Sequence, residues 1–176
     1  MNTLKYYKMN ENVKSPLPAT KGSACFDICA NIKPDDLIVV YDMHNNKIER
    51  KPELHGEIYN QELAIFIKPA DRILIPTGLI FDIPVNHSVR LHPRSSISLK
   101  KGLTIPNGEG IIDSDYYHQT FVMLYNAGAD TINILNGERI AQAELIKTYE
   151  YDIKETKNIP EQTTNRVGGF GSTGVK

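Results

Sequence analysis

The chain has 176 residues, of which 40% are hydrophobic and 23% are charged, and its formal net charge is −1. This length suits one domain, and the balanced charge argues against a broad basic surface for stable nucleic-acid binding. No stretch approaches the roughly 20 apolar residues of a membrane-spanning helix, and the polar residues 1–18 lack the apolar core of a signal peptide. We therefore expect a cytoplasmic protein that does not bind membranes.

Short runs of aliphatic, β-branched and aromatic residues recur along the chain, with proline and glycine between them. This pattern predicts an all-β protein, built as a sandwich, jelly roll or barrel. Helical periodicity is confined to residues 95–101, where Gly102 stands in the position at which helices often end. The ten predicted strands are 4–9, 24–30, 37–43, 63–68, 72–75, 79–83, 88–92, 121–125, 131–135 and 139–146.

The predicted strand 24–30 carries an unusual acidic residue. Alternation places Phe26 and Ile28, with the alanines at both ends, on the core face and Asp27 on the opposite face. A lone aspartate in a strand is usually exposed to solvent, but strands disfavour aspartate, so its position there requires an explanation. Cys25 and Cys29 would lie about 13 Å apart at ~3.3 Å per residue, which is too far for a disulfide. We expect free thiols, and neither the cysteines nor the five histidines have the spacing of a zinc site.

Two segments differ in composition from the predicted strands. Residues 44–62 are charged and contain a proline, which predicts a solvated loop or hairpin inserted between strands. From Asn158 the chain becomes polar and then glycine-rich, a composition that cannot build a core. We therefore divide the chain into a β-domain, residues 1–157, and a C-terminal arm, residues 158–176, which we expect to be mobile without a ligand.

Residues 107–117 read Asn-Gly-Glu-Gly-Ile-Ile-Asp-Ser-Asp-Tyr-Tyr, and the apolar run 121–125 follows. Two glycines bracket an apolar pair that ends in two carboxylates. This pattern predicts a β-hairpin with Asp113 and Asp115 at its tip. Aspartate and serine are also common in ordinary turns, so this segment alone does not establish a functional site.

Five motifs, in order along residues 18–174, make the segment more informative. They are Pro18–Ile28, Pro93–Ser96, Asn107–Tyr116, Gly137–Gln142 and Gly168–Gly174. Together they resemble the five ordered motifs of the trimeric dUTPases, including those of phages and bacteria. The resemblance implies a jelly-roll homotrimer with active sites between subunits. It also implies a dUTP diphosphatase that uses Mg²⁺ to hydrolyse dUTP to dUMP and pyrophosphate, which keeps uracil out of DNA and supplies dUMP for dTMP synthesis.

The resemblance also implies roles for two carboxylates. Asp113 matches the base that orients and activates the attacking water, a role worth roughly 10²–10⁴ in rate. Asp27 matches the residue that holds water molecules of the Mg²⁺ shell. Since Mg²⁺ relies largely on substrate phosphates and water, no cage of protein ligands is required. Asp115 is interpreted as a turn or supporting residue, because a second nearby carboxylate would repel the first.

The remaining implied residues bind the two ends of dUTP. Uracil is read by main-chain groups around Asn107, Gly110 and Ile112, while Tyr116 lies beneath the deoxyribose and leaves no room for a 2′-hydroxyl. Phe170 stacks over the uracil. The phosphates are bound by Arg94 and Ser95, at the start of the predicted helix whose free N–H groups favour anions, and by Ser96, Gln142, Arg166, Gly171 and Ser172.

Several positions depart from the family pattern. Cys25 and Ser96 stand where glycine is usual, and Tyr117-His118-Gln119 replaces a step that commonly has a small or charged residue and glycine. Only one residue separates Arg166 from the glycines that follow, where the family more often has two. If the spacing from the glycines governs, Asn165 occupies the arginine position and Arg166 must reach the terminal phosphate from beside it.

Three alternatives stay open. The Ser95-Ser96 step also resembles the dCTP deaminases, which share the fold but lack the Gly-Gly-Phe-Gly tail and the Ile-Asp-Ser-Asp-Tyr sequence. A regulatory protein could use the dUTPase fold to bind a partner through residues 44–62. A trimeric β-module without activity is the third, although every chemically needed side chain is retained. We predict a dUTP pyrophosphatase.

Overall fold

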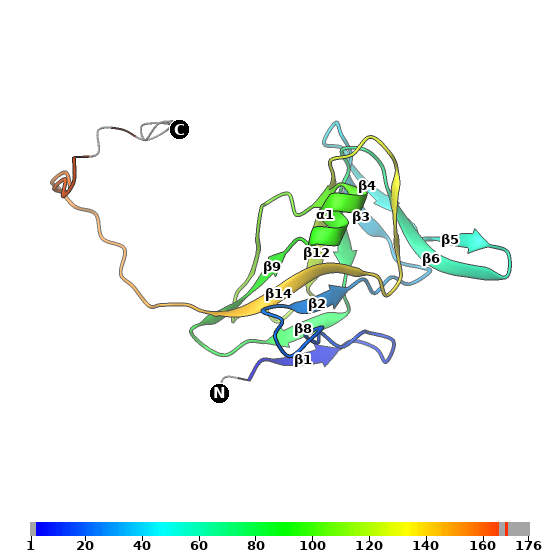
Figure 1. The fold of residues 1–176 in the computed structure, drawn as a ribbon, viewed down its shortest axis with the longest axis horizontal. Coiled ribbons are helices and arrows are strands. Elements are labelled where there is room, and N and C mark those ends of the chain that lie inside the picture. The colour runs from blue at the N-terminus through cyan, green and yellow to red at the C-terminus, as the bar shows by residue number, and fades with distance from the viewer. Residues whose placement is uncertain (1–2, 166–167, 169–176) are drawn as a thin grey trace.

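A computed structural model describes residues 3–165 and residue 168. Within these residues the chain forms fourteen strands and one short helix, α1 (Figure 1). In chain order they are β1 (Lys5–Lys8), β2 (Phe26–Cys29), β3 (Ile38–Tyr41), β4 (Lys47–Arg50), β5 (Glu53–Glu57), β6 (Asn60–Ile67), β7 (Arg72–Pro76), β8 (Leu79–Asp82), β9 (His87–His92), α1 (Ser95–Lys101), β10 (Leu103–Thr104), β11 (Gly110–Ile112), β12 (Phe121–Asn126), β13 (Ile132–Leu135) and β14 (Arg139–Lys147).

The strands form two main sheets that share one core. One sheet has the order β10-β12-β7-β3-β4 and the other has the order β11-β9-β14-β2; β13-β6-β5 and β1-β8 form smaller sheets. Alternate residues of these strands face inward, so Ile75 of β7, Val122 of β12 and Val89 of β9 are each 0% exposed. The prediction of an all-β protein with one short helix is confirmed, and each of the ten predicted strands is present with slightly different ends.

The alternation predicted for the segment around Asp27 holds over most of its length. Ile28 is buried and Phe26 packs against the core, whereas Asp27 lies on the other face and is half-buried. Ala24 is exposed, contrary to expectation, because β2 begins only at Phe26 and the residue before it is not held in the sheet. The two cysteines are free, as predicted.

Residues 44–62 are part of the sheets. β4 pairs with β3, and β5 pairs with β6 in a hairpin that extends away from the rest of the fold (Figure 1). The base of this segment reaches the core, since Arg50 Nη1 lies 2.8 Å from Asp71 Oδ2 and the Asp71 side chain is only 3% exposed. Removing Arg50 would leave a buried carboxylate without its cation, which is strongly destabilising. The segment is therefore a hairpin with a structural base.

The predicted hairpin with Asp113 at its tip is wrong. β11 pairs with β9, whereas β12 pairs with β7 and β10, so the strands on either side of residues 113–120 belong to different sheets. Both strands satisfy their own alternation in this way, with Ile112 and Val122 buried in the common core. Asp113 therefore lies where the chain crosses from one sheet to the other.

Helix α1 joins β9 to β10 and has the predicted end. Gly102 adopts a left-handed conformation (φ 63°), and its N–H donates to the Ile97 carbonyl. At the other end, Arg94 is the N-cap residue, and its carbonyl accepts from the N–H groups of Ile97 and Ser98. No helix among residues 3–165 and 168 has the length and apolar character needed to cross a bilayer.

Candidate active site

A pocket of about 330 Å³ lies beside β11, where the edges of the two main sheets approach each other. We call it the β11 pocket. Leu74, Leu91 and Met123 contribute apolar walls from three strands. The pocket also brings together one group of predicted site residues, which comprises Asn107, Gly110, Ile112, Asp113 and Tyr116.

Backbone conformation shapes the entry to β11. Gly108 has a positive φ of 77°, and its N–H donates to the Ile105 carbonyl at 3.0 Å, which closes a turn. The Asn107 side chain reinforces this turn, because its Nδ2 donates to the Glu109 carbonyl at 2.9 Å. A Cβ at Gly110 would lie 3.0 Å from Leu91 Cβ, so a larger residue there would push β11 away from β9.

Asp113 and Tyr116 lie in the crossing that follows β11. The Tyr116 N–H donates to the Asp113 carbonyl at 3.1 Å, and the Tyr116 hydroxyl donates to the Gln119 carbonyl at 3.0 Å. The tyrosine ring also makes an edge contact with His118. The Asp113 side chain is exposed, and none of residues 3–165 and 168 binds its carboxylate oxygens. That carboxylate is free to accept a hydrogen bond from water.

A second pocket, of about 300 Å³, lies beside the start of α1, and we call it the Arg94 pocket. It brings together the other described group of predicted site residues, which comprises Asp27, Arg94, Ser95, Ser96 and Gln142. The two pockets have no lining residue in common. Within one chain, the predicted site residues therefore form two separate sets.

Ion pairs organise the Arg94 pocket. Arg94 Nε lies 2.9 Å from Asp27 Oδ1, and Arg139 Nη1 lies 3.1 Å from Asp27 Oδ2. Gln142 is fixed differently, because its Nε2 donates to the Pro93 carbonyl at 3.0 Å. Arg139 was missed by sequence reasoning even though it lies in the Gly137–Gln142 motif. Strict alternation from Gln142 would place Arg139 on the face opposite Asp27, and the register shift between Arg139 and Ala141 brings it to the same face.

The Arg94 pocket fits a cation held through water. Asp27 is the only acidic residue that lines it, and among the described residues no group of three or more His, Cys, Asp or Glu side chains could hold a metal. A carboxylate offers about four lone-pair sites, so Asp27 keeps acceptor capacity beyond its two arginine contacts. Mg²⁺ commonly keeps several waters and binds substrate phosphates, which matches this donor set.

The cysteine in the Arg94 pocket is not equipped to act as a nucleophile. Burial raises the pKa of the Cys25 thiol, and the negative charge of Glu144 raises it further. For Cys29, burial and then the charge of Asp27 raise the pKa, against smaller opposing effects of nearby cations. Because the thiolate is the reactive form, these shifts disfavour reaction at either thiol.

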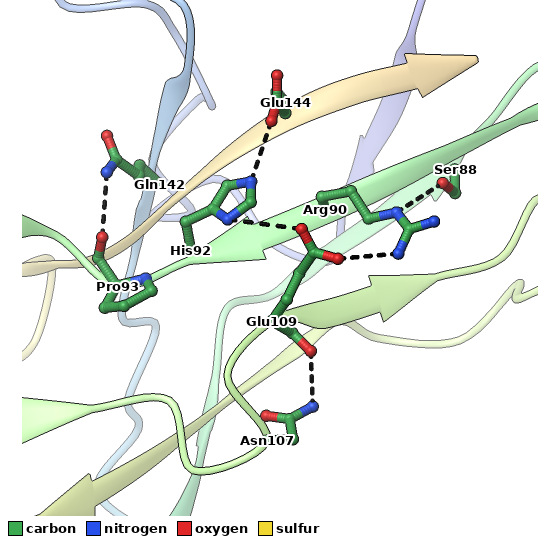
Figure 2. Close-up of polar contacts among 8 residues, drawn as sticks. All are labelled: Ser88, Arg90, His92, Pro93, Asn107, Glu109, Gln142 and Glu144. Carbon is green, nitrogen blue, oxygen red and sulfur yellow. Dashed lines mark hydrogen bonds and ion pairs between the residues drawn. The ribbon is translucent and has the colours of Figure 1, made fainter. Parts of the chain in front are cut away.

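Polar side chains of β9, of β14 and of the turn before β11 contact one another between the two pockets, as Figure 2 shows. Arg90 Nη1 lies 2.9 Å from Glu109 Oε2, and His92 Nδ1 lies 3.7 Å from Glu109 Oε1. His92 Nε2 in turn lies 3.1 Å from Glu144 Oε1. Sequence reasoning missed these contacts, since they join residues that are distant in the chain.

The C-terminal arm is described only in part. Residues 148–165 contain no helix or strand, extend away from the sheets in Figure 1, and line neither pocket. Its apolar side chains are largely exposed to solvent, with Tyr149 77% and Ile153 88% exposed. The predicted site residues Arg166, Phe170, Gly171 and Ser172 lie outside the described residues, and the division of the chain at residue 158 stays a prediction.

The sequence and the fold were compared with known proteins. The family model for dUTPase matches residues 58–174. A deoxyuridine 5′-triphosphate nucleotidohydrolase of Caulobacter vibrioides is 33% identical over 171 residues, which cover 97% of this chain and 92% of that protein. A mutant dUTPase of Staphylococcus bacteriophage 80alpha, solved with dUpNHpp, has a TM-score of 0.74 at 20% identity and covers 99% of this chain and 100% of its own.

A second similar structure is described with a bound metal ion. A mutant dUTPase from phage phi11 of S. aureus, described for its coordination of a structural Mg(II) ion, has a TM-score of 0.68 at 18% identity. The match covers 91% of this chain and 100% of that one. At these identities the two phage structures show a common fold, the jelly roll expected from the sequence.

Proposed function

Because this chain belongs to the dUTPase family, we propose that the β11 pocket and the Arg94 pocket are the nucleoside and phosphate parts of its active site. The enzyme is a dUTPase, which hydrolyses dUTP to dUMP and pyrophosphate. The observation that carries the proposal is the grouping of residues from four separate motifs into two pockets of opposite chemistry. One has apolar walls and a free carboxylate, and the other has arginine, serine and glutamine.

Asp113 is the general base in this proposal. It accepts a proton from water as the water oxygen bonds to the α-phosphorus, and the bond from that phosphorus to the pyrophosphate oxygen breaks. Its carboxylate suits the role because no described residue engages its oxygens. Mg²⁺ bound to the triphosphate would offset part of the phosphate charge, and Asp27 would hold its water shell.

Recognition of the nucleoside falls to the main chain at residues 107–112 and to the ring of Tyr116. Uracil presents its O4 acceptor beside an N3–H donor, and cytosine presents the reverse. A site that pairs with uracil leaves buried polar groups unpaired against cytosine, which can reject the wrong substrate by about 10⁴–10⁵. The Tyr116 ring excludes a 2′-hydroxyl, Phe170 stacks on the base, and Arg166 binds the terminal phosphate.

We further propose that the complete site forms between copies of the chain in a homotrimer. The outer face of the β12-β7-β3 sheet leaves apolar side chains uncovered, with Phe121 40% and Tyr41 41% exposed. Large exposed apolar side chains on one sheet face are candidates for a protein interface. A second copy placed there, beside the β11 pocket, can present its own Arg94 pocket to the same substrate.

Mixing two impaired variants, assayed at dUTP concentrations well below KM, tests this arrangement. Asp113→Asn and Arg94→Ala each damage every site of their own homotrimer. If a site takes Asp113 from one copy and Arg94 from another, a mixed trimer contains at least one intact site, and activity returns after the variants are unfolded and refolded together. Activity that stays at the level of the separate variants would show that one copy supplies both residues.

Substrate preference tests the function itself. With Mg²⁺, we expect pyrophosphate release from dUTP and scarcely any from dCTP, dTTP or UTP, and we expect a chelator to abolish it reversibly. Ammonia released from dCTP would instead identify a deaminase. In Tyr116→Ala, hydrolysis of UTP should rise relative to dUTP, because the ring that excludes the 2′-hydroxyl is gone.

A partner-binding role is favoured by one further observation. At the end of the β5-β6 hairpin, Ile58 is 83% exposed and Tyr59 is 100% exposed. Exposed side chains this apolar do not improve solubility, so we interpret them as a surface that contacts a partner. Deleting the whole segment 44–62 is a poor test, because it also removes Arg50 from buried Asp71. Replacing Ile58 and Tyr59 with serine should spare turnover, and loss of turnover would instead assign this hairpin to the catalytic assembly.

A further inference from the structure

We propose that Glu109 is a positioning residue for nucleoside recognition, which fixes residues 107–112 against β9. This inference rests on the proposed function of the β11 pocket. Asn107, Gly110 and Ile112 line that pocket, while Glu109 itself does not. Its contribution comes through the backbone that it holds.

The strand that carries the recognition groups is short and lies at an edge. β11 has three residues and is the terminal strand of its sheet, and among the described strands only β9 pairs with it. Its register places Gly110 opposite Leu91 and Ile112 opposite Val89. Three backbone pairs hold β11 weakly to β9, because a short segment at a sheet edge can separate from the sheet at low free energy. The residues that lead into β11 therefore depend on additional contacts.

Glu109 supplies contacts on both its backbone and its side chain. Its N–H donates to the Asn107 carbonyl at 2.9 Å, and its own carbonyl accepts from Asn107 Nδ2 at 2.9 Å. Its carboxylate reaches β9 through Oε2, which lies 2.9 Å from Arg90 Nη1, while Oε1 lies 3.7 Å from His92 Nδ1, beyond hydrogen-bond distance and an ion pair only when that ring is protonated. Glu109 therefore closes the turn and connects it to the neighbouring strand β9 (Figure 2).

The two side chains that hold Glu109 are themselves held. Arg90 Nε donates to Ser88 Oγ at 3.0 Å, which leaves Nη1 directed at the carboxylate. His92 Nε2 contacts Glu144 Oε1 at 3.1 Å, which anchors the ring to β14. The Arg90 and His92 side chains are only 23% and 27% exposed. An isolated surface ion pair contributes little, but a network of this kind fixes geometry.

Fixed geometry matters here because main-chain groups recognise the uracil base in the proposed function. A displacement of about 1 Å in a positioning element can cost as much as 10²-fold. Loss of the Glu109 contacts should therefore weaken binding of dUTP and blur the distinction between uracil and cytosine. Proton transfer to Asp113 should suffer less, because Asp113 lies beyond the β11 ladder.

The first test is the kinetics of Glu109→Ala and Glu109→Gln. We expect kcat/KM for dUTP to fall about 5- to 20-fold in the alanine variant, mainly through KM, and the preference for dUTP over dCTP to fall as well. Glu109→Gln should fall between this variant and wild type. Asp82→Ala is the matched control, because it removes an exposed cross-strand ion pair with Lys5 on β1 and β8.

The second test is rescue by exchange of charge. Arg90→Glu and Glu109→Arg should each raise KM, and the double variant should recover part of the loss. Amide hydrogen exchange should speed up at residues 107–112 in Glu109→Ala and return toward wild type in the double variant. A purely structural role would lower thermal stability without changing KM or base preference in the folded enzyme.

The inference is overturned if folded Glu109→Ala keeps KM and base preference within about twofold of wild type. Failure of the wild-type enzyme to hydrolyse dUTP would overturn the proposed function instead. Hydrogen exchange distinguishes the two cases, since it reports whether Glu109 holds residues 107–112 whatever the substrate is.

Discussion

The β11 pocket and the Arg94 pocket are built by different means. The β11 pocket is shaped by backbone conformation and packing, through the turn at Gly108, the close approach of Gly110 to Leu91, and apolar walls. The Arg94 pocket is shaped by charged side chains, with Arg94 paired to Asp27 across the sheet. Under the proposed function, one pocket would select by fixed shape and hydrogen-bonding pattern, and the other would attract the triphosphate by charge.

This difference indicates how substitutions should act. A change in the β11 pocket should alter base preference or the chemical step, and salt should have little influence on it. A change in the Arg94 pocket should alter affinity for the phosphates and the dependence on salt. In the proposed function Asp113 belongs to the first pocket but acts on phosphorus, so catalysis would require the two pockets to be aligned.

The largest effect is expected for Asp113→Asn. The amide cannot accept the proton from water, so kcat should fall at least about 10²-fold while KM changes little. Steady-state kinetics with dUTP and Mg²⁺ measure both quantities. Asp115→Asn is the matched control, since Asp115 is an exposed carboxylate in the same crossing that does not line the pocket. A larger loss in Asp115→Asn would move the role of base to that residue.

Removal of residues 166–176 should have the next largest effect. If Arg166 binds the terminal phosphate, kcat/KM should fall about 10- to 100-fold, because hydrogen bonds to charged groups contribute roughly 1.5–3 kcal/mol. The last strand among the described residues ends at Lys147, so the shortened chain should keep its fold and its circular dichroism spectrum. Arg166→Ala and Asn165→Ala separate the two candidates for the arginine position. Wild-type turnover in the shortened enzyme would remove the arm from catalysis.

The sequence was sufficient to predict ten of the fourteen strands and the one helix among the described residues, whereas the roles of the site residues stay predictions. Alternating patterns located the ten strands, and Gly102 located the end of α1, because both signals are local. Pairing is not local. The segment at Asp113 has the pattern of a hairpin, but β11 and β12 each bury their apolar residues better against other strands.

Two polar features escaped prediction for related reasons. The register shift after Arg139 changes which face the side chain occupies, and alternation cannot anticipate such a shift. The contacts of Glu109 with Arg90 and His92 depend on the pairing of β11 with β9, which was predicted incorrectly. A correct account of the sheet order would have placed these three side chains together.

Arg94→Ala should affect binding more than chemistry. We expect KM for dUTP to rise about tenfold with a smaller change in kcat, since this arginine contributes positive charge to the Arg94 pocket, the proposed phosphate site. The increase in KM with salt should be shallower than in wild type, because one cation fewer attracts the triphosphate. Lys5→Ala, on β1, removes the same charge far from the pocket residues and serves as the control. An unchanged salt dependence in Arg94→Ala would contradict the phosphate role.

The smallest expected effect concerns stability in the wall of the β11 pocket. Thr120 is 2% exposed, and its hydroxyl has no hydrogen-bond partner among the described residues. Thr120→Val keeps the shape and removes the unpaired group, so the free energy of unfolding should rise by about 1 kcal/mol and Tm by roughly 2–4 °C. Thr77→Val is the matched control and should lower stability, because the Thr77 hydroxyl donates to the Thr120 carbonyl at 2.6 Å and accepts from the Leu79 N–H at 3.2 Å. If Thr120→Val lowers Tm as well, its hydroxyl has a partner such as a buried water, and the pocket wall is then more polar than the protein atoms alone make it.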